Sequence, residues 1–145
     1  MMANKFEFPW VKMMNVEPTV MQPGRLGFTH TPEAIHLNHN DDINASVLYC
    51  LGEMSGSGVL VMELGSAAKD AFVVIKKGNI EYLARASGVL TTEANLSEEQ
   101  RTRVAEAIKA KSPIEETVLV SICNADGAEV ARCEITSVLK PRRAP

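Results

Sequence analysis

One segment in the first half of the chain limits the possible folds more than any other. Residues 38–42, Asn-His-Asn-Asp-Asp, form a polar turn rich in side chains that cap helices, and a long apolar stretch with helical spacing follows it. The apolar positions of this stretch are Val47, Leu48, Leu51, Met54 and Val59. Many positions between them are glycine, alanine or serine, although a glycine costs a helix interior about 0.5–1 kcal/mol relative to alanine. Such small residues favour a helix that other backbones approach closely, as when a curved sheet wraps around it. The alternative is a helix that ends near Gly56.

Patterns typical of β-strands fill most of the second half. The runs are residues 71–83, 88–95, 117–123 and 129–139. The last two flank Asn124-Ala-Asp-Gly127, which predicts a hairpin turn. An antiparallel sheet curled around one central helix meets these demands, so the pattern alone predicts an α+β fold.

Shorter elements complete the expected order. Ser97-Glu-Glu-Gln100 is a capping box and predicts a surface helix to about residue 110. Near the N-terminus, the spacing of apolar residues over 5–16 predicts a short amphipathic helix. Two extended pieces follow, over residues 24–30 and 33–37.

Length and composition exclude several classes of protein. The 145 residues suit one domain over residues 1–145, and 46% apolar with 23% charged residues is ordinary for a soluble globular protein. A formal net charge of −3 provides no basic surface for nucleic acid. No apolar run reaches the length of a membrane span, so we expect none. We also expect no signal peptide, since Lys5, Glu7 and Pro9 interrupt the N-terminus. Three cysteines without C-x-x-C spacing favour free thiols and a cytoplasmic location.

The three histidines raise the question of a metal site. His30, His36 and His39 form no H-E-x-x-H pattern and have no cysteine nearby in the sequence. We therefore expect no metal, and we interpret His36 as a strand residue and His39 as a turn residue. No glycine-rich phosphate loop is present either, so no cofactor site is assigned.

The central segment resembles a known motif. His36-x-Asn38, the polar turn and the run from Ala45 to Glu53 (Ala-Ser-Val-Leu-Tyr-Cys-Leu-Gly-Glu) resemble the central motif of hotdog-fold acyl-CoA thioesterases of the phenylacetate-pathway type. Phe8-Pro-Trp10 and Ile80-Glu-Tyr-Leu83 are similar to an uncharacterised branch grouped with them. The resemblance implies a hotdog fold, in which a curved antiparallel sheet wraps around a long central helix.

The resemblance also implies an activity and a site. The family hydrolyses thioesters of coenzyme A or of acyl-carrier protein, and coenzyme A is part of the substrate, not a separate cofactor. By position, Glu53 is the carboxylate that acts as general base or nucleophile, and Ala45 lies where a backbone N–H polarises the thioester carbonyl. Asn38 is similar to the residue that orients substrate or water. Asn44 lies beside Ala45 in the candidate site, where it either serves catalysis or only caps the helix.

Two features qualify this expectation. Asn44-Ala45 stands where the family has His-Gly or Gly-Gly, and the methyl group of Ala45 narrows the approach to a substrate. Glu53 also lies eight residues after Ala45, about 12 Å along a helix, which is too far for both to reach one carbonyl. A homodimer, or a dimer of dimers, solves this if the helix start of one subunit approaches Glu53 of the other.

Two other functions on the same fold remain open. An acyl-thioester hydratase or dehydratase pairs its carboxylate with a histidine, and His36 would have to serve here. A non-catalytic acyl-CoA-binding protein is the other alternative, and the missing turn glycines favour it.

Overall fold

The computed structural model describes residues 7–142, which form one antiparallel sheet and three α-helices. The helices are α1 (Pro9–Met13), α2 (Ala45–Leu64) and α3 (Glu98–Ala110). The strands are β1 (Val16–Gln22), β2 (Arg25–His30), β3 (Ala71–Tyr82), β4 (Leu90–Asn95), β5 (Ile114–Asn124) and β6 (Glu129–Pro141). Their order in the sheet is β1-β2-β4-β5-β6-β3, and every neighbouring pair is antiparallel.

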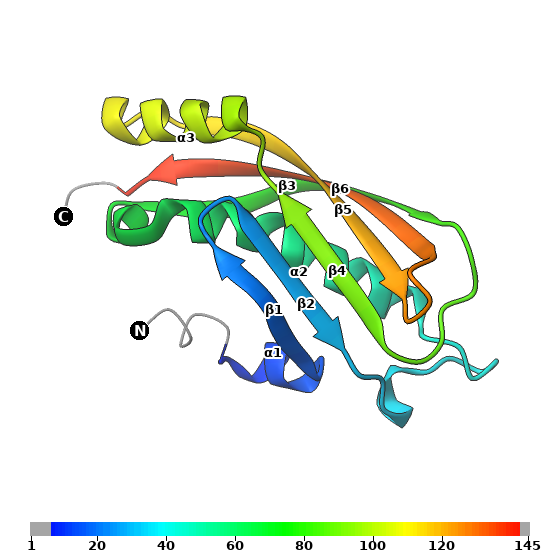
Figure 1. Ribbon diagram of the computed structural model, residues 1–145. Helices are drawn as coiled ribbons and strands as arrows, with labels where there is room; N and C mark the ends of the chain where they lie inside the picture. The colour runs from blue at the N-terminus through cyan, green and yellow to red at the C-terminus, as the bar shows by residue number, and fades with distance from the viewer. Residues whose placement is uncertain (1–6, 143–145) are drawn as a thin grey trace.

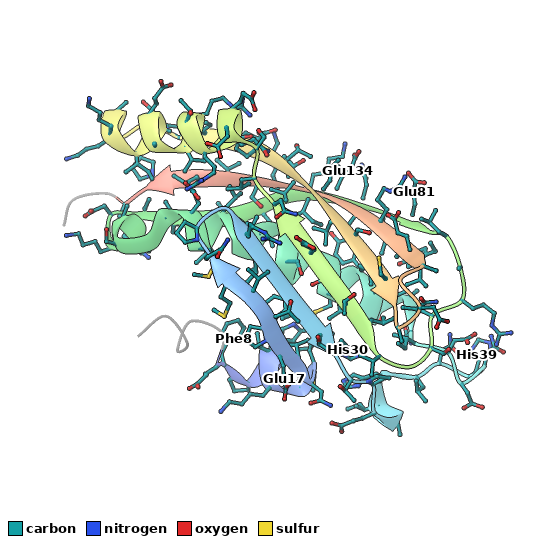
Figure 2. The ribbon with its side chains drawn as sticks, viewed as in Figure 1. Phe8, Glu17, His30, His39, Glu81 and Glu134 are labelled. Carbon is teal, nitrogen blue, oxygen red and sulfur yellow. The ribbon has the colours of Figure 1, made fainter. Side chains whose placement is uncertain are left out.

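The sheet curves around α2, as Figure 1 shows, with α3 on the outer side and α1 beside the end of β1. Strands alternate buried and exposed residues, because one face meets α2 and the other faces water. In Figure 2, Glu81 and Glu134 lie on that outer face. The predicted central helix, strand runs and hairpin are confirmed.

The glycines of α2 explain how closely helix and sheet approach. A Cβ added to Gly56 would lie 2.8 Å from the Cβ of Ile135 on β6, and one added to Gly52 would collide with Cys133 on the same strand. The predicted close approach is therefore confirmed, and the helix continues past Gly56 to Leu64.

Two expectations near the N-terminus are wrong. Residues 33–37 are not extended, because Ala34–His36 forms a 3-10 helix. The side chain of the N-cap Glu33 accepts the backbone N–H of His36, and the His36 ring accepts the backbone N–H of Glu33. The sequence also gave no sign of β1, an edge strand that contains Pro18 and a bulge between Pro18 and Val20. The predicted helix over 5–16 is shorter, Pro9–Met13, and residues 5–6 lie outside the described part of the chain.

Among residues 7–142, one helix is long and apolar enough to cross a membrane by length and composition alone. Residues 45–69 contain an 18-residue window of mean hydropathy 1.3, of which 61% is buried inside the fold. We expected no apolar run long enough to span a membrane, and by length and composition this window is one. Since the sheet covers most of this helix, its hydrophobicity is explained by its place in the core.

Candidate active site

The sheet leaves one stripe of α2 uncovered. The residues that are partly or fully exposed recur every fourth position, while most other positions of the helix are buried. The stripe consists of Ala45, Tyr49, Glu53, Ser57 and Val61. Each step of four residues advances about 40° around the helix axis, so these side chains form a continuous stripe that winds around α2. We call it the open face of α2.

Glu53 is the acidic residue in the middle of the open face. Its side chain is partly buried, and burial raises the pKa of its carboxyl above the ordinary value, which the nearby Ser57 partly opposes. The Ser57 hydroxyl itself donates to the backbone carbonyl oxygen of Glu53 at 2.8 Å. Glu63 on the same helix differs, because Arg101 binds it at 3.1 Å. A half-buried carboxylate without a cationic partner in the described part of the chain is suited to accept a proton.

A groove with a volume of about 290 Å³ begins at Glu53 and follows the open face. The lining residues are Phe8, Trp10, Val11, Glu53, Met54, Ser57, Gly58 and Val61. The helix α1 supplies one wall and α2 the other. Apart from Glu53 and Ser57, which lie one helical turn apart, the named side chains are apolar. The groove therefore has a polar site on one wall and apolar surface elsewhere.

The start of α2 contains the predicted backbone donor. Asn44 is the N-cap, and its side-chain oxygen accepts hydrogen bonds from the Ser46 N–H at 3.0 Å and the Ser46 hydroxyl at 2.8 Å. Ala45 is the first helical residue, and its carbonyl oxygen accepts the Tyr82 hydroxyl at 3.2 Å. No acceptor for the Ala45 N–H is found among residues 7–142, as is usual for the first N–H groups of a helix.

Asn38 lies in the turn before α2 and shapes it. Its side-chain oxygen accepts the N–H of Asn40 at 2.8 Å and that of Asp42 at 3.3 Å. Arg85 pairs with Asp42 at 2.8 Å and ties the turn to the segment after β3. The capping bonds of Asn44 and the turn bonds of Asn38 are thus structural, and a catalytic part for either residue stays a prediction.

Within one chain the structure does not bring the predicted site residues together. Ala45 and Glu53 lie on the same helix, eight residues apart, so their separation along the axis is about 12 Å. The loop with Asn38 lies at the start of that helix, whereas the groove runs from Glu53 toward Val61. A single chain therefore presents two separate half-sites.

Two buried histidines hold α1 against the body. His30 donates from Nδ1 to the carbonyl oxygen of Met14 at 2.6 Å, and His36 donates from Nε2 to that of Met13 at 2.7 Å. The Nδ1 atom of His36 accepts the Glu33 N–H at 2.9 Å, which fixes the neutral tautomer of this ring. The rings meet edge to face, 4.8 Å between centroids. Figure 2 shows His30 at the end of β2, below which α1 lies.

Trp10 lies on the other side of α1. Burial raises the pKa of the Cys50 thiol on α2, and the neighbouring Trp10 side chain opposes part of that rise. Sequence reasoning placed Trp10 in an amphipathic helix and predicted that Cys50 is buried, which is confirmed. It missed that Trp10 borders the same groove as Glu53, because no local pattern reports a contact between segments forty residues apart.

Two of the cations that could bind the phosphate groups of coenzyme A already form ion pairs. Lys76 pairs with Glu115 at 2.6 Å, and Arg85 pairs with Asp42, both at exposed positions. In the part of the chain that the structure describes, no group of three His, Cys, Asp or Glu side chains is placed to hold a metal ion.

The fold and the site can now be compared with known proteins. A protein of unknown function from Pseudomonas aeruginosa, described as a probable thioesterase, is 19% identical with a TM-score of 0.82, over 94% of this chain and 89% of that one. A protein of unknown function from Chlorobaculum tepidum is 15% identical with a TM-score of 0.83, over 97% and 91%. A Streptococcus mutans protein, solved with bound acetyl-CoA, is 17% identical with a TM-score of 0.69, over 90% and 92%. No curated protein matches the chain.

These likenesses, together with the six-stranded antiparallel sheet around α2, show that the protein has the hotdog fold, as the sequence predicted. The chain belongs to the family described as "Domain of unknown function (DUF4442)", which matches residues 1–139. This family match does not test the phenylacetate-pathway type, which stays a prediction.

Proposed function

We propose that the protein is a thioesterase that hydrolyses an acyl-CoA or acyl-carrier-protein thioester at a site formed by two subunits. The observation that carries this proposal is Glu53, a half-buried carboxylate of raised pKa at the head of an apolar groove on the open face of the central helix. The probable thioesterase from P. aeruginosa and the acetyl-CoA-bound protein from S. mutans have the same fold and support the same class of substrate.

The chemistry follows from the groups at the two half-sites. Glu53 takes a proton from a water molecule, and the resulting hydroxide attacks the carbonyl carbon of the thioester. The Ala45 N–H of the partner subunit donates a hydrogen bond to the oxyanion, and the partial positive charge of the helix N-terminus adds to this stabilisation. The C–S bond then breaks, the thiol leaves with the proton that Glu53 accepted, and the acyl group leaves as a carboxylic acid that loses its proton to the solvent. Asn38 and Asn44 keep the helix start in place and are candidates for orienting the substrate.

The edge strand β3 supports a homodimer. It is 12 residues long, only its β6 side is paired, and Val74 and Ile75 are about two-fifths exposed. A long apolar edge strand invites pairing with another chain, and a second copy of β3 would satisfy its free backbone groups. Because Tyr82 on β3 contacts Ala45, such pairing would bring the helix starts close to the interface.

The hydratase alternative requires a histidine that can reach the substrate, and His36 does not meet this requirement. His36 is 3% exposed, and both ring nitrogens are engaged, one with Met13 and one with Glu33. A general acid must reach the substrate, so this ring is badly placed for the role. The non-catalytic acyl-CoA-binding alternative is tested by the same experiment as the thioesterase.

Thiol release from a series of acyl-CoA substrates tests the proposal. Glu53→Gln should lower kcat/KM by about 10²–10⁴, the usual contribution of a general base. Glu106→Gln, a matched change at an exposed position of α3, should leave the rate unchanged. Full activity of Glu53→Gln, or binding of acyl-CoA without thiol release by the wild type, would contradict the proposal.

A further inference from the structure

We infer that the groove between α1 and α2 binds an unbranched acyl chain of about eight to twelve carbons, and that Val61 determines this length. The inference rests on the proposed function, because it takes Glu53 as the point where the thioester carbonyl lies. It adds the substrate class, which neither the fold nor the family assigns.

The lining of the groove selects the chemistry of its ligand. Beyond Glu53 and Ser57 the named walls carry no charged group: Phe8, Trp10 and Val11 face the groove from α1, and Met54 and Val61 from α2. A second carboxylate on the acyl group would find no cation there and would meet the negative charge of Glu53. Burial of methylene groups, in contrast, is favourable at every one of these walls.

Two dimensions set the length of the chain. From Glu53 to Val61 the groove follows α2 for eight residues, which is about 12 Å and fits an extended chain of about eight to ten carbons. Its volume is about 290 Å³. An apolar cavity of about 150 Å³ holds benzene, so this groove has room for roughly twice that number of carbons. Both dimensions match a chain of this length better than an acetyl group or a long-chain acyl group.

The wall formed by α1 is held in a fixed position. The carbonyl oxygens of Met13 and Met14 at its C-terminal end accept hydrogen bonds from His36 and His30. Two hydrogen bonds to buried rings hold this five-residue helix and give the groove a defined width. A defined width favours a straight chain over a bulky ring, because overpacking against fixed walls is costly.

Trp10 is the only tryptophan of the protein and is 52% exposed, so its fluorescence reports directly on the groove. The probe is a thioether analogue of decanoyl-CoA, which lacks the carbonyl and cannot be hydrolysed. Its binding should shift the Trp10 emission to shorter wavelength as the indole loses water. The acetyl and phenylacetyl thioether analogues should bind at least about tenfold more weakly, since each buried methylene contributes about fourfold in affinity.

Val61→Phe fills the far end of the groove and leaves Trp10 in place as the fluorescent reporter. It should weaken binding of the decanoyl analogue by about 15- to 60-fold, equivalent to two or three methylenes without contact, and change the hexanoyl analogue little. Leu119→Phe places the same ring on the outer face of β5, where Leu119 is 61% exposed, and should change neither. These measurements involve no turnover, so their outcome is separate from that of the proposed function.

Binding with the expected chain-length order supports the inference even if no thiol is ever released. An unchanged Trp10 emission at saturating decanoyl analogue would overturn it. Tighter binding of the phenylacetyl than of the decanoyl analogue, or equal losses in Val61→Phe and Leu119→Phe, would overturn it as well, even in an active thioesterase.

Discussion

Replacing Gly56 with alanine tests how tightly the sheet packs on the central helix. The new Cβ would lie 2.8 Å from the Cβ and Cγ1 atoms of Ile135 and 3.2 Å from Cγ2 of Val120. Carbon atoms prefer separations of about 3.5–4.0 Å, so β6 must move away from α2 by several tenths of an ångström. The Cβ of Ile135 cannot rotate out of the way, because it is bonded directly to the strand backbone.

The expected change is the difference of two opposing effects. Alanine favours the helix by about 0.5–1 kcal/mol over glycine, while overpacking a core costs about 1–3 kcal/mol. We expect Gly56→Ala to lower the free energy of unfolding by about 1–2 kcal/mol, which corresponds to a fall in Tm of about 2–8 °C.

Urea unfolding followed by circular dichroism measures this change. Ser57→Ala is the matched control, since its side chain lies on the open face of the same helix and should alter stability by less than about 0.5 kcal/mol. If Gly56→Ala instead raises the free energy of unfolding by about 0.5–1 kcal/mol, as at an exposed helical position, the close packing of α2 on β6 is refuted.

Three further predictions concern buried groups and the edge strand. Burial lowers the pKa of His30 and outweighs the hydrogen bond to Met14, which raises it, so the folded state binds this proton less readily than the unfolded chain does. The contribution of neutral His30 to the free energy of unfolding is complete above the unfolded pKa of about 6.5 and is lost as the pH falls below it. Between about pH 6.5 and 5, the free energy of unfolding should therefore fall more steeply in the wild type than in His30→Leu. Equal dependence on pH in the two proteins would contradict the assignment. Burial raises the pKa of Cys133 to about 11 and also raises that of Cys50. After brief iodoacetamide treatment of the native protein, mass spectrometry should therefore find Cys123 alkylated first. Equal labelling of all three cysteines would contradict the burial of Cys50 and Cys133. Ile75→Lys should shift the protein from dimer to monomer in light scattering, whereas Leu119→Lys should not, and an unchanged dimer would exclude the β3 edge as the interface.

The sequence was most informative where local chemistry determines the structure. The capping box is one example, because Ser97 and Gln100 exchange the predicted bonds at the start of α3, at 3.1 and 3.0 Å. The small residues of α2 are another, since Gly52 and Gly56 contact β6 as expected.

It was least informative where the structure depends on contacts distant in sequence. Residues 33–37 alternate like a strand, but a side-chain bond between Glu33 and His36 turns them into a short helix. Strand β1 is an edge strand, which tolerates Pro18 and needs no apolar alternation.

In the candidate site, too, the residues of one continuous segment were predicted and the contacts between distant segments were not. The resemblance to thioesterases identified Glu53 and the start of α2, both of which belong to one continuous segment. The apolar groove could not be predicted, because Trp10 reaches it only when His30 and His36 fix α1 in place.

The central claim is that Glu53 of one subunit and the Ala45 N–H of the other form one site, and mixing two inactive variants tests it. Ala45→Pro removes only that N–H, because proline is accepted at the first helical position and Asn44 already has the extended conformation that precedes proline, with ψ 138°. It should lower kcat/KM by about 10²–10³.

The Glu53→Gln and Ala45→Pro variants are unfolded together in equal amounts and refolded, and thiol release from decanoyl-CoA is measured. Half of the dimers are then mixed, and each mixed dimer has one site with both groups intact, so about a quarter of the wild-type activity should return. If the mixture stays as inactive as its two components, although light scattering shows dimers, the shared site is contradicted.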